Sequence, residues 1–93
     1  MPKALWKDLV LADSENTERV EGNHYFPPDA VNMDYLTMTA RHTYCPWKGE
    51  ASYYSIDIAG EVLEHAAWTY LEPSEKANNI KSYIAFDRRV TIE

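Results

Sequence analysis

The segment TYCPWKGEASYY, residues 43–54, contains the side chains of this sequence that are best suited to chemistry. It holds the only cysteine, Cys45, shortly before Lys48. A reactive thiolate needs nearby positive charge, and both Lys48 and Arg41 are close to Cys45 in the sequence. Pro46 weakens this interpretation because it has no amide hydrogen to offer a thiolate or an oxyanion. Cys45 is therefore the candidate catalytic residue of a reactive-thiol site, and the alternative, which we favour for the cysteine itself, is that it fills the core as a small hydrophobic side chain.

A pocket for a small molecule is the second interpretation of this segment. Gly49 would permit a close approach to the chain beside Lys48, and aromatic residues from three motifs could form a wall there if the motifs converge in space. Aromatic surface with one or two fixed polar groups is the usual make-up of small-molecule sites. The predicted ligand-binding residues are Tyr25, Phe26, Trp47, Lys48, Gly49, Trp68 and Tyr70. The same aromatic side chains could instead fill the core, with Lys48 packing over the ring of Trp47.

A metal site is not expected. Structural zinc needs four ligands, usually in pairs with short spacings. With one cysteine, such a site would have to combine Cys45 with His42 and with His24 or His65, and the chain has no Cys-x-x-Cys pair. We therefore predict a protein that contains no stoichiometric zinc and keeps its fold in a strong chelator, because removal of structural zinc would unfold it. No cofactor is predicted.

Composition indicates one small globular domain. The chain has 93 residues, of which 45% are hydrophobic and 13% aromatic, so large side chains can supply a core in a small volume. Fifteen acidic residues against nine basic ones give a net charge of −6, which argues against nucleic acid as a partner. No apolar run approaches the roughly 20 residues that span a bilayer, and charges at positions 7 and 8 interrupt the first apolar stretch, so we expect a cytoplasmic protein without membrane contact.

The elements that must position these residues are mainly strands, because the dominant hydrophobic period is two. Residues 51–58 and 61–70 predict a hairpin turning at Ala59 and Gly60. Its interior face is predicted to combine Tyr54, Ile56 and Ile58 with Trp68. Further strands are predicted within residues 4–12, 17–22, 36–41, 82–86 and 89–93, which makes six or seven in all. Short helical turns are expected within residues 73–80, with Ser74 as N-cap, and after Pro28.

Four motifs link this sequence to a known family. They are GNHYFP (22–27), CPWKGEASYY (45–54), AAWTYLEP (66–73) and IKSYIAF (80–86). In this order and spacing they closely resemble the small bacterial family called domain of unknown function 427, and the resemblance spans nearly all of residues 1–93. It implies a β-tent-like fold, which methionine sulfoxide reductase B also has. Some classifications attach a nucleotidyltransferase-like label to the family, but this sequence has no glycine-rich phosphate cradle.

Together these features predict a single mainly-β domain over residues 1–93, β-tent-like, with a small-ligand or reactive-thiol site at the Cys-Pro-Trp-Lys-Gly loop. Whether it is an enzyme stays open at this point. The alternative is a structural or protein-interaction module without catalysis, which would use an exposed strand edge or a flat aromatic patch. A concave pocket floored by Trp47 and Trp68 would favour the ligand site, and no protein partner is identified by the sequence.

Overall fold

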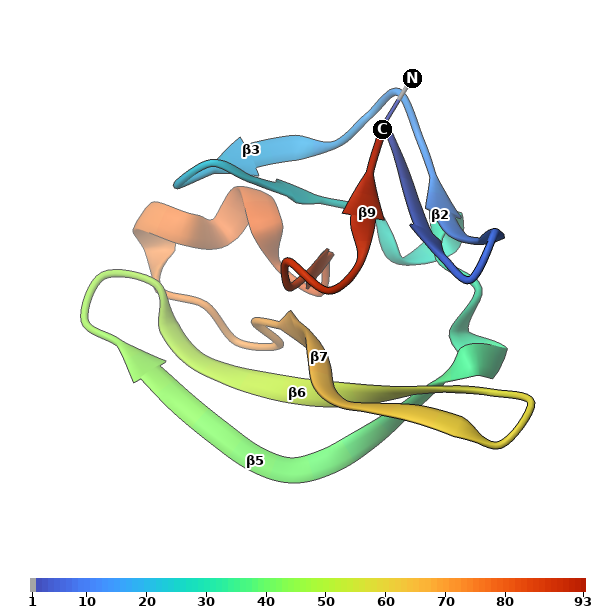
Figure 1. Ribbon diagram of the computed structural model, residues 1–93. Coiled ribbons are helices and arrows are strands. Elements are labelled where there is room, and N and C mark those ends of the chain that lie inside the picture. Colours follow the sequence, from blue (N-terminus) through green and yellow to red (C-terminus); the bar gives the residue numbers. More distant parts are fainter. Residues whose placement is uncertain (1) are drawn as a thin grey trace.

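A computed structural model describes residues 2–93 as nine strands in three antiparallel sheets, with three short 3-10 helical turns (Figure 1). The strands are β1 (Lys3–Trp6), β2 (Leu9–Asp13), β3 (Glu18–Val20), β4 (Asn23–Tyr25), β5 (Leu36–Cys45), β6 (Gly49–Ile58), β7 (Glu61–Thr69), β8 (Ile84–Phe86) and β9 (Thr91–Ile92). The helical turns are η1 (Pro28–Ala30), η2 (Met33–Tyr35) and η3 (Glu75–Ile80). The mainly-β prediction is confirmed.

The structure has two more strands than the upper predicted count. Residues 4–12 form a hairpin rather than one strand, because Lys7 and Asp8 both adopt positive φ, 53° and 64°, in a two-residue turn between β1 and β2. The other addition is β4, which pairs with β3 across a turn at Glu21 and Gly22. η1 and η3 lie where helical turns were predicted.

The sheets have the orders β2-β1-β9, β3-β4 and β5-β6-β7-β8. In Figure 1 the long strands β5, β6 and β7 form the lower layer, and the two smaller sheets lie above them. The two ends of the chain meet at the top, where Lys3 and Glu93 exchange backbone hydrogen bonds of 3.0 and 2.9 Å. Phe26 and Ile84 exchange a further pair, of 2.8 and 2.9 Å, and so connect the segment after β4 to the edge strand β8.

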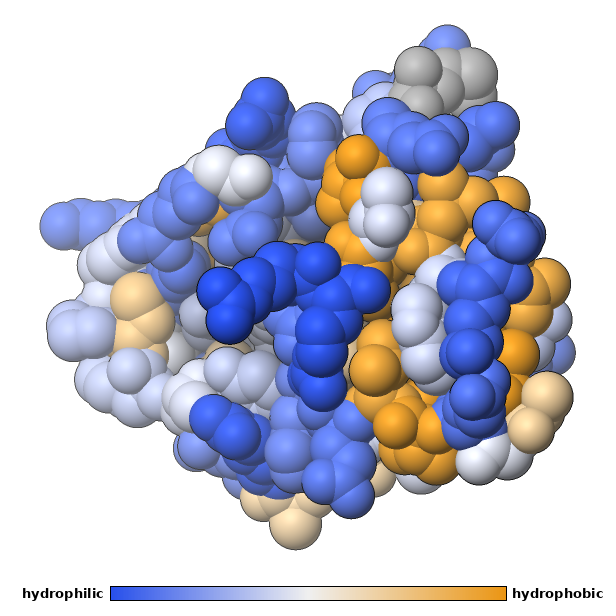
Figure 2. Space-filling model, in the orientation of Figure 1, coloured by the Kyte–Doolittle hydropathy of each residue, from blue (hydrophilic) through white to orange (hydrophobic). Residues whose placement is uncertain are grey.

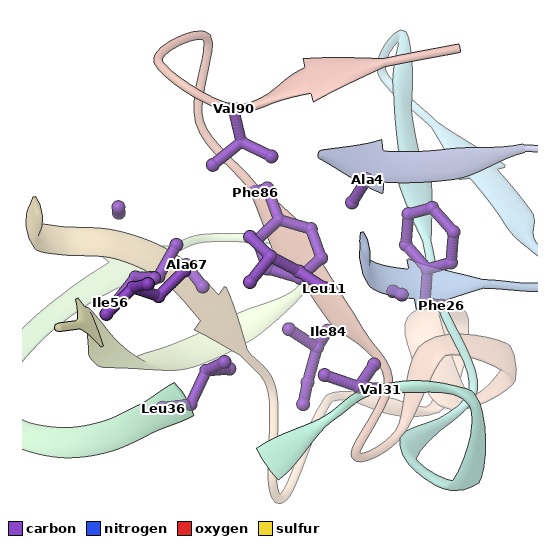
Figure 3. Packing of buried hydrophobic residues seen from close by; sticks show 13 residues of the cluster. Ala4, Leu11, Phe26, Val31, Leu36, Ile56, Ala67, Ile84, Phe86 and Val90 are labelled. Carbon is purple, nitrogen blue, oxygen red and sulfur yellow. The ribbon is translucent and has the colours of Figure 1, made fainter. Parts of the chain in front are cut away.

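The main core lies between the four-stranded sheet and the sheet formed by β1, β2 and β9 (Figure 3). Its buried side chains include Ala4, Leu11, Phe26, Val31, Leu36, Ile56, Ala67, Ile84, Phe86 and Val90. The rings of Phe26 and Phe86 meet edge to face with centroids 5.9 Å apart. On the outside, Figure 2 shows hydrophobic residues gathered on the side of β2, β9 and the β6–β7 turn, while hydrophilic residues cover the side of β3.

A second cluster packs on the other face of the four-stranded sheet. It is formed by Tyr25, Ala51, Tyr70, Ala77, Ile80 and Ala85, with Cys45, Tyr53 and Trp68 partly buried against it. Tyr25 and Phe26 are neighbours in the extended chain and enter different clusters, as alternation of side chains requires. Aromatic residues thus gather on one face of the sheet, and aliphatic residues predominate on the other.

The predicted interior face of the β6–β7 hairpin was wrong in one respect. Ile56 and Ile58 are buried and Tyr54 is half-buried against the main core, as predicted. Trp68, however, pairs with Tyr53 and not with a residue of that set. Because paired residues of neighbouring strands point to the same side, Trp68 and Tyr53 share the face opposite to Tyr54.

The turn explains this difference. Ala59 and Gly60 adopt φ of 52° and 82°, which makes a two-residue connection that pairs Ile58 with Glu61. Odd-numbered residues of β7 therefore share the face of the buried isoleucines, whereas the prediction placed even-numbered residues there. The register between β6 and β7 shifts once, before residue 67 and near His65, which adopts a positive φ of 55°. Among residues 2–93, no helix is long and apolar enough to cross a membrane.

Candidate functional site

A cavity of about 430 Å³ lies over the aromatic face of the four-stranded sheet. Its lining comes from β4, β5, β6, β7 and the loops around them, and consists of Asn23, Tyr25, Arg41, Lys48, Tyr53, Glu64, His65, Trp68, Tyr70, Asp87 and Arg89. Four of the residues named from the sequence meet here: Tyr25, Lys48, Trp68 and Tyr70. The cavity volume is that of a site for a single small molecule.

Three predicted residues lie elsewhere. Phe26 is fully buried in the main core on the other face of the sheet. Trp47 is 39% exposed and borders a different surface hollow with Ser74 and Lys76. Gly49 does not line the cavity. It is the first residue of β6, directly after Lys48, and its φ of 109° is one that residues with a side chain rarely adopt.

Aromatic rings make the wall of the cavity. Trp68 and Tyr25 meet edge to face, with centroids 6.4 Å apart, and the Trp68 indole N–H donates to the Tyr25 hydroxyl over 3.1 Å. The ring centroid of Tyr70 lies 6.5 Å from that of Tyr25, and the ring centroid of Tyr53 lies 6.3 Å from that of Trp68. Each ring therefore lies against another ring, and these contacts hold the wall in place.

Lys48 places a buried positive charge at this wall. The residue is only 6% exposed, and its Nζ lies 5.4 Å from the centroid of the Tyr70 ring and 5.5 Å from that of Trp47. Its backbone closes the turn after β5, because the Lys48 N–H donates to the Cys45 carbonyl over 3.2 Å. Pro46, at the second position of this tight turn, favours it, and the turn directs the lysine inward.

Glu21 is the ionic partner of Lys48 and comes from the turn between β3 and β4. Burial lowers the pKa of the Lys48 ammonium, but the hydrogen bond to Glu21, together with the negative charges of Glu21 and of Tyr25 and Tyr70 when these are ionised, outweighs it, so the net pKa lies above its usual value. The same hydrogen bond to Lys48 holds the pKa of Glu21 below its usual range. Lys48 is therefore a permanent cation near neutral pH, and is unsuited to act as a nucleophilic amine.

The tyrosine hydroxyls are neutral donors and acceptors. Burial raises the pKa of Tyr25, although the hydrogen bond that it accepts from Trp68 acts in the opposite direction. Burial also raises the pKa of Tyr70, while the positive charge of Lys48 opposes the change. Neither phenol is therefore an ionised base at neutral pH.

The rim of the cavity carries two guanidinium groups. Arg41 lies with its Cζ 5.1 Å from the centroid of the Tyr53 ring. Arg89 is held by the Asp87 carboxylate, with Nε 3.0 Å from Oδ2, and it also donates to the Glu64 carbonyl over 2.7 Å. These contacts place positive charge around an aromatic wall.

Cys45 does not line the cavity. It ends β5, is partly buried, and packs against the aromatic cluster rather than opening into the space beside Lys48. A nucleophilic cysteine needs a base within hydrogen-bond reach, and the described part of the chain gives Cys45 no hydrogen-bonded histidine. The geometry supports a packing role for this thiol.

This role makes an alkylation experiment informative. We expect a small alkylating reagent to modify Cys45 more slowly in the native protein than in the unfolded chain, because the aromatic cluster shields the sulfur. The measurement is the rate of iodoacetamide labelling with and without denaturant at one pH. Faster labelling of the native protein would show that the thiol is activated and would make it the leading catalytic candidate.

The three histidines do not gather around Cys45. His24 Nδ1 is hydrogen-bonded to Thr17 Oγ1 over 3.0 Å, and His65 Nδ1 is hydrogen-bonded to Thr39 Oγ1 over 3.1 Å. His42 pairs with Ser52, whereas Thr43 and Cys45 alternate to the other face of the sheet. Within residues 2–93, no group of three or more His, Cys, Asp or Glu side chains is placed to hold a metal ion.

Sequence reasoning missed part of the cavity lining. Tyr53, His65 and Arg89 were not among the predicted ligand-binding residues, although they line the cavity with Trp68. For Tyr53 a signal was present, because a two-residue turn at 59–60 already places Trp68 on the same face as Tyr53. For Arg89, which reaches the cavity from the segment after β8, the sequence offers no such signal.

The comparisons with known proteins identify the family and give no activity. No curated protein matches this chain. A family model described as a domain of unknown function, DUF427, and named NTP_transf_9, matches residues 3–93. The match covers all the strands and every residue of the cavity lining. The chain belongs to the DUF427 family.

Proposed function

We propose that this protein binds a small molecule in the cavity beside Lys48. The observation that carries the proposal is the buried Lys48 ammonium at a wall of four aromatic side chains. Burying a charge is unfavourable, and a hydrophobic residue of similar volume would serve packing alone at least as well. A lysine at this position suits recognition of a ligand.

The aromatic wall supports the same function. Tyr25 and Trp68 are joined by a hydrogen bond, so their rings present a fixed surface rather than a mobile one. A fixed wall lowers the entropy that a ligand must lose on binding. Cys45 contributes to this proposal only by packing behind the wall.

A protein-interaction module is the second candidate, and one observation favours it. Tyr44 is 73% exposed and Trp47 is 39% exposed, and both lie at the same end of β5. Exposed aromatic side chains of this kind are typical of contact surfaces. They lie outside the cavity lining, so variants can separate the two functions.

The test of the small-molecule site is a fragment screen by saturation-transfer NMR with a blocked variant. Asn23 lines the cavity from β4, and Asn23→Trp should fill the space and abolish the signals of bound fragments. Asn78→Trp, at an exposed position in η3, is the matched control and should leave them unchanged. Melting curves of both variants establish that they are folded.

Two results would contradict the proposal. One is the absence of any fragment that binds the native protein. The other is a set of fragments that bind Asn23→Trp as well as they bind the native chain, because their site would then lie elsewhere.

A further inference from the structure

The cavity is less acidic than the chain as a whole. The whole protein has 15 acidic and nine basic residues, whereas the lining contains three Lys or Arg and two Asp or Glu side chains, and Glu21, which pairs with Lys48, makes the two signs equal there. The basic ones are Arg41, Lys48 and Arg89, and the acidic ones are Glu64 and Asp87. Positive groups that gather in a concave site of an acidic protein attract anions to that site.

The cations of the lining differ in how far they are neutralised. Arg89 is bound through both Nε and Nη2 to Asp87, at 3.0 and 2.6 Å from Oδ2. Arg41, by contrast, has no carboxylate within 4.0 Å in the described residues 2–93, and it lies over the Tyr53 ring. Lys48 pairs with Glu21, whose side chain is 51% exposed, so that solvent screens the attraction within this pair.

Hydrogen-bond donors are in excess as well. The Tyr25 oxygen accepts from the Trp68 indole, which leaves the phenolic proton free to donate. The Lys48 ammonium carries three protons, and one of them is donated in the hydrogen bond to Glu21. A ligand that brings acceptor oxygens would satisfy these donors, whereas a cationic ligand would meet them with repulsion.

We infer that the ligand is a planar ring compound bearing one carboxylate, with its ring against Trp68 and Tyr53 and its carboxylate toward Lys48. The inference rests on the proposed function. A carboxylate brings acceptor oxygens for the free protons of Lys48 and Tyr25, and the shape of the wall matches a ring. A phosphate is typically held by a glycine-rich cradle of backbone N–H groups, and the lining contains no glycine.

Three probes of nearly the same shape test the charge preference. Benzoate, benzamide and benzylamine share a ring and carry a negative, neutral or positive group. We expect benzoate to bind at least tenfold more tightly than benzamide, and benzylamine to bind more weakly than either. Phenyl phosphate is the further arm, and it should bind more weakly than benzoate. Dissociation constants come from chemical-shift titration of the labelled protein.

Variants with opposite expected effects assign this preference to Lys48. Lys48→Met should weaken benzoate binding at least tenfold and change benzamide binding by less than about twofold. Glu21→Gln should strengthen benzoate binding severalfold, because the ammonium loses its internal counter-charge. Lys76→Met, at an exposed lysine outside the cavity, is the control and should change neither. If Lys48→Met does not fold, the Glu21→Gln result decides.

The outcomes separate the inference from the proposed function. If benzamide or benzylamine binds in the cavity as tightly as benzoate, the carboxylate preference is wrong and the small-molecule site stands. If phenyl phosphate binds most tightly, the ligand is a phosphate and the inference is equally wrong. Weaker benzoate binding by Glu21→Gln would contradict the role of Lys48. Absence of binding by every probe and every screened fragment would overturn both.

Discussion

Replacement of Ile56 by alanine should lower the free energy of unfolding by about 2–5 kcal/mol. Ile56 is 0% exposed, and it pairs with Leu36 on one side and with Leu63 on the other. The substitution leaves a cavity at the centre of the long strands, where the surrounding sheet cannot collapse to fill it. A chain of 93 residues has little stability in reserve, so a loss of this size is large.

Ile92→Ala is the matched control for this experiment. Ile92 lies in the two-residue strand β9 and is 37% exposed, so the same loss of methyl and methylene groups should have a much smaller effect. The measurement is urea unfolding followed by tryptophan fluorescence, with the midpoint and slope compared for the three proteins. Equal midpoints for Ile56→Ala and the native chain would show that the packing described for β6 is wrong.

Replacement of Trp68 by leucine should weaken binding of a ring compound at least tenfold, which corresponds to about 1.4 kcal/mol. The indole is the largest ring of the cavity lining, and it contacts both Tyr25 and Tyr53. Leucine keeps an apolar side chain in the strand but removes the flat surface and the N–H donor to Tyr25. The probe is whichever of benzoate, benzamide and benzylamine binds the native protein most tightly.

Trp6→Leu provides the comparison for Trp68→Leu. Trp6 lies in β1 and packs against the main core, away from the cavity. We expect it to lose some stability and to keep the affinity for the probe. If both tryptophan variants lose affinity equally, the loss reflects general destabilisation, and the aromatic wall has no specific part in binding.

The hairpin shows how far the sequence determines the fold. Alternation predicts that Ile56 and Ile58 are buried, because a strand that covers a core must place every second side chain inward. The face of Trp68 is set by the turn at 59–60, and its pairing with Tyr53 depends in addition on the register shift near His65. A shift in strand pairing depends on how neighbouring strands fit together, so the hydrophobic pattern of one strand does not reveal it.

The candidate site likewise has a part that the sequence predicts and a part that depends on how the sheets pack. Tyr25, Lys48 and Trp68 lie in distinctive motifs, and their residue types suggested an aromatic site with a cation, provided that the motifs converge in space. The pairing of Lys48 with Glu21 joins residues 27 positions apart through the turn between β3 and β4. Such a contact follows from how two separate sheets pack, and neither period nor motif spacing contains that information.

The indole N–H signals of the 15N-labelled protein test the small-molecule site most directly. The three tryptophans sample three places: Trp68 lines the cavity, Trp47 lies on an outer loop and Trp6 lies in β1. On titration with benzoate, benzamide and benzylamine, we predict a saturable shift of the Trp68 signal for at least one probe, with the Trp6 signal unmoved. A Trp68 signal that stays fixed for all three probes and for every fragment of the screen, or a Trp6 signal that moves as far, would contradict the site.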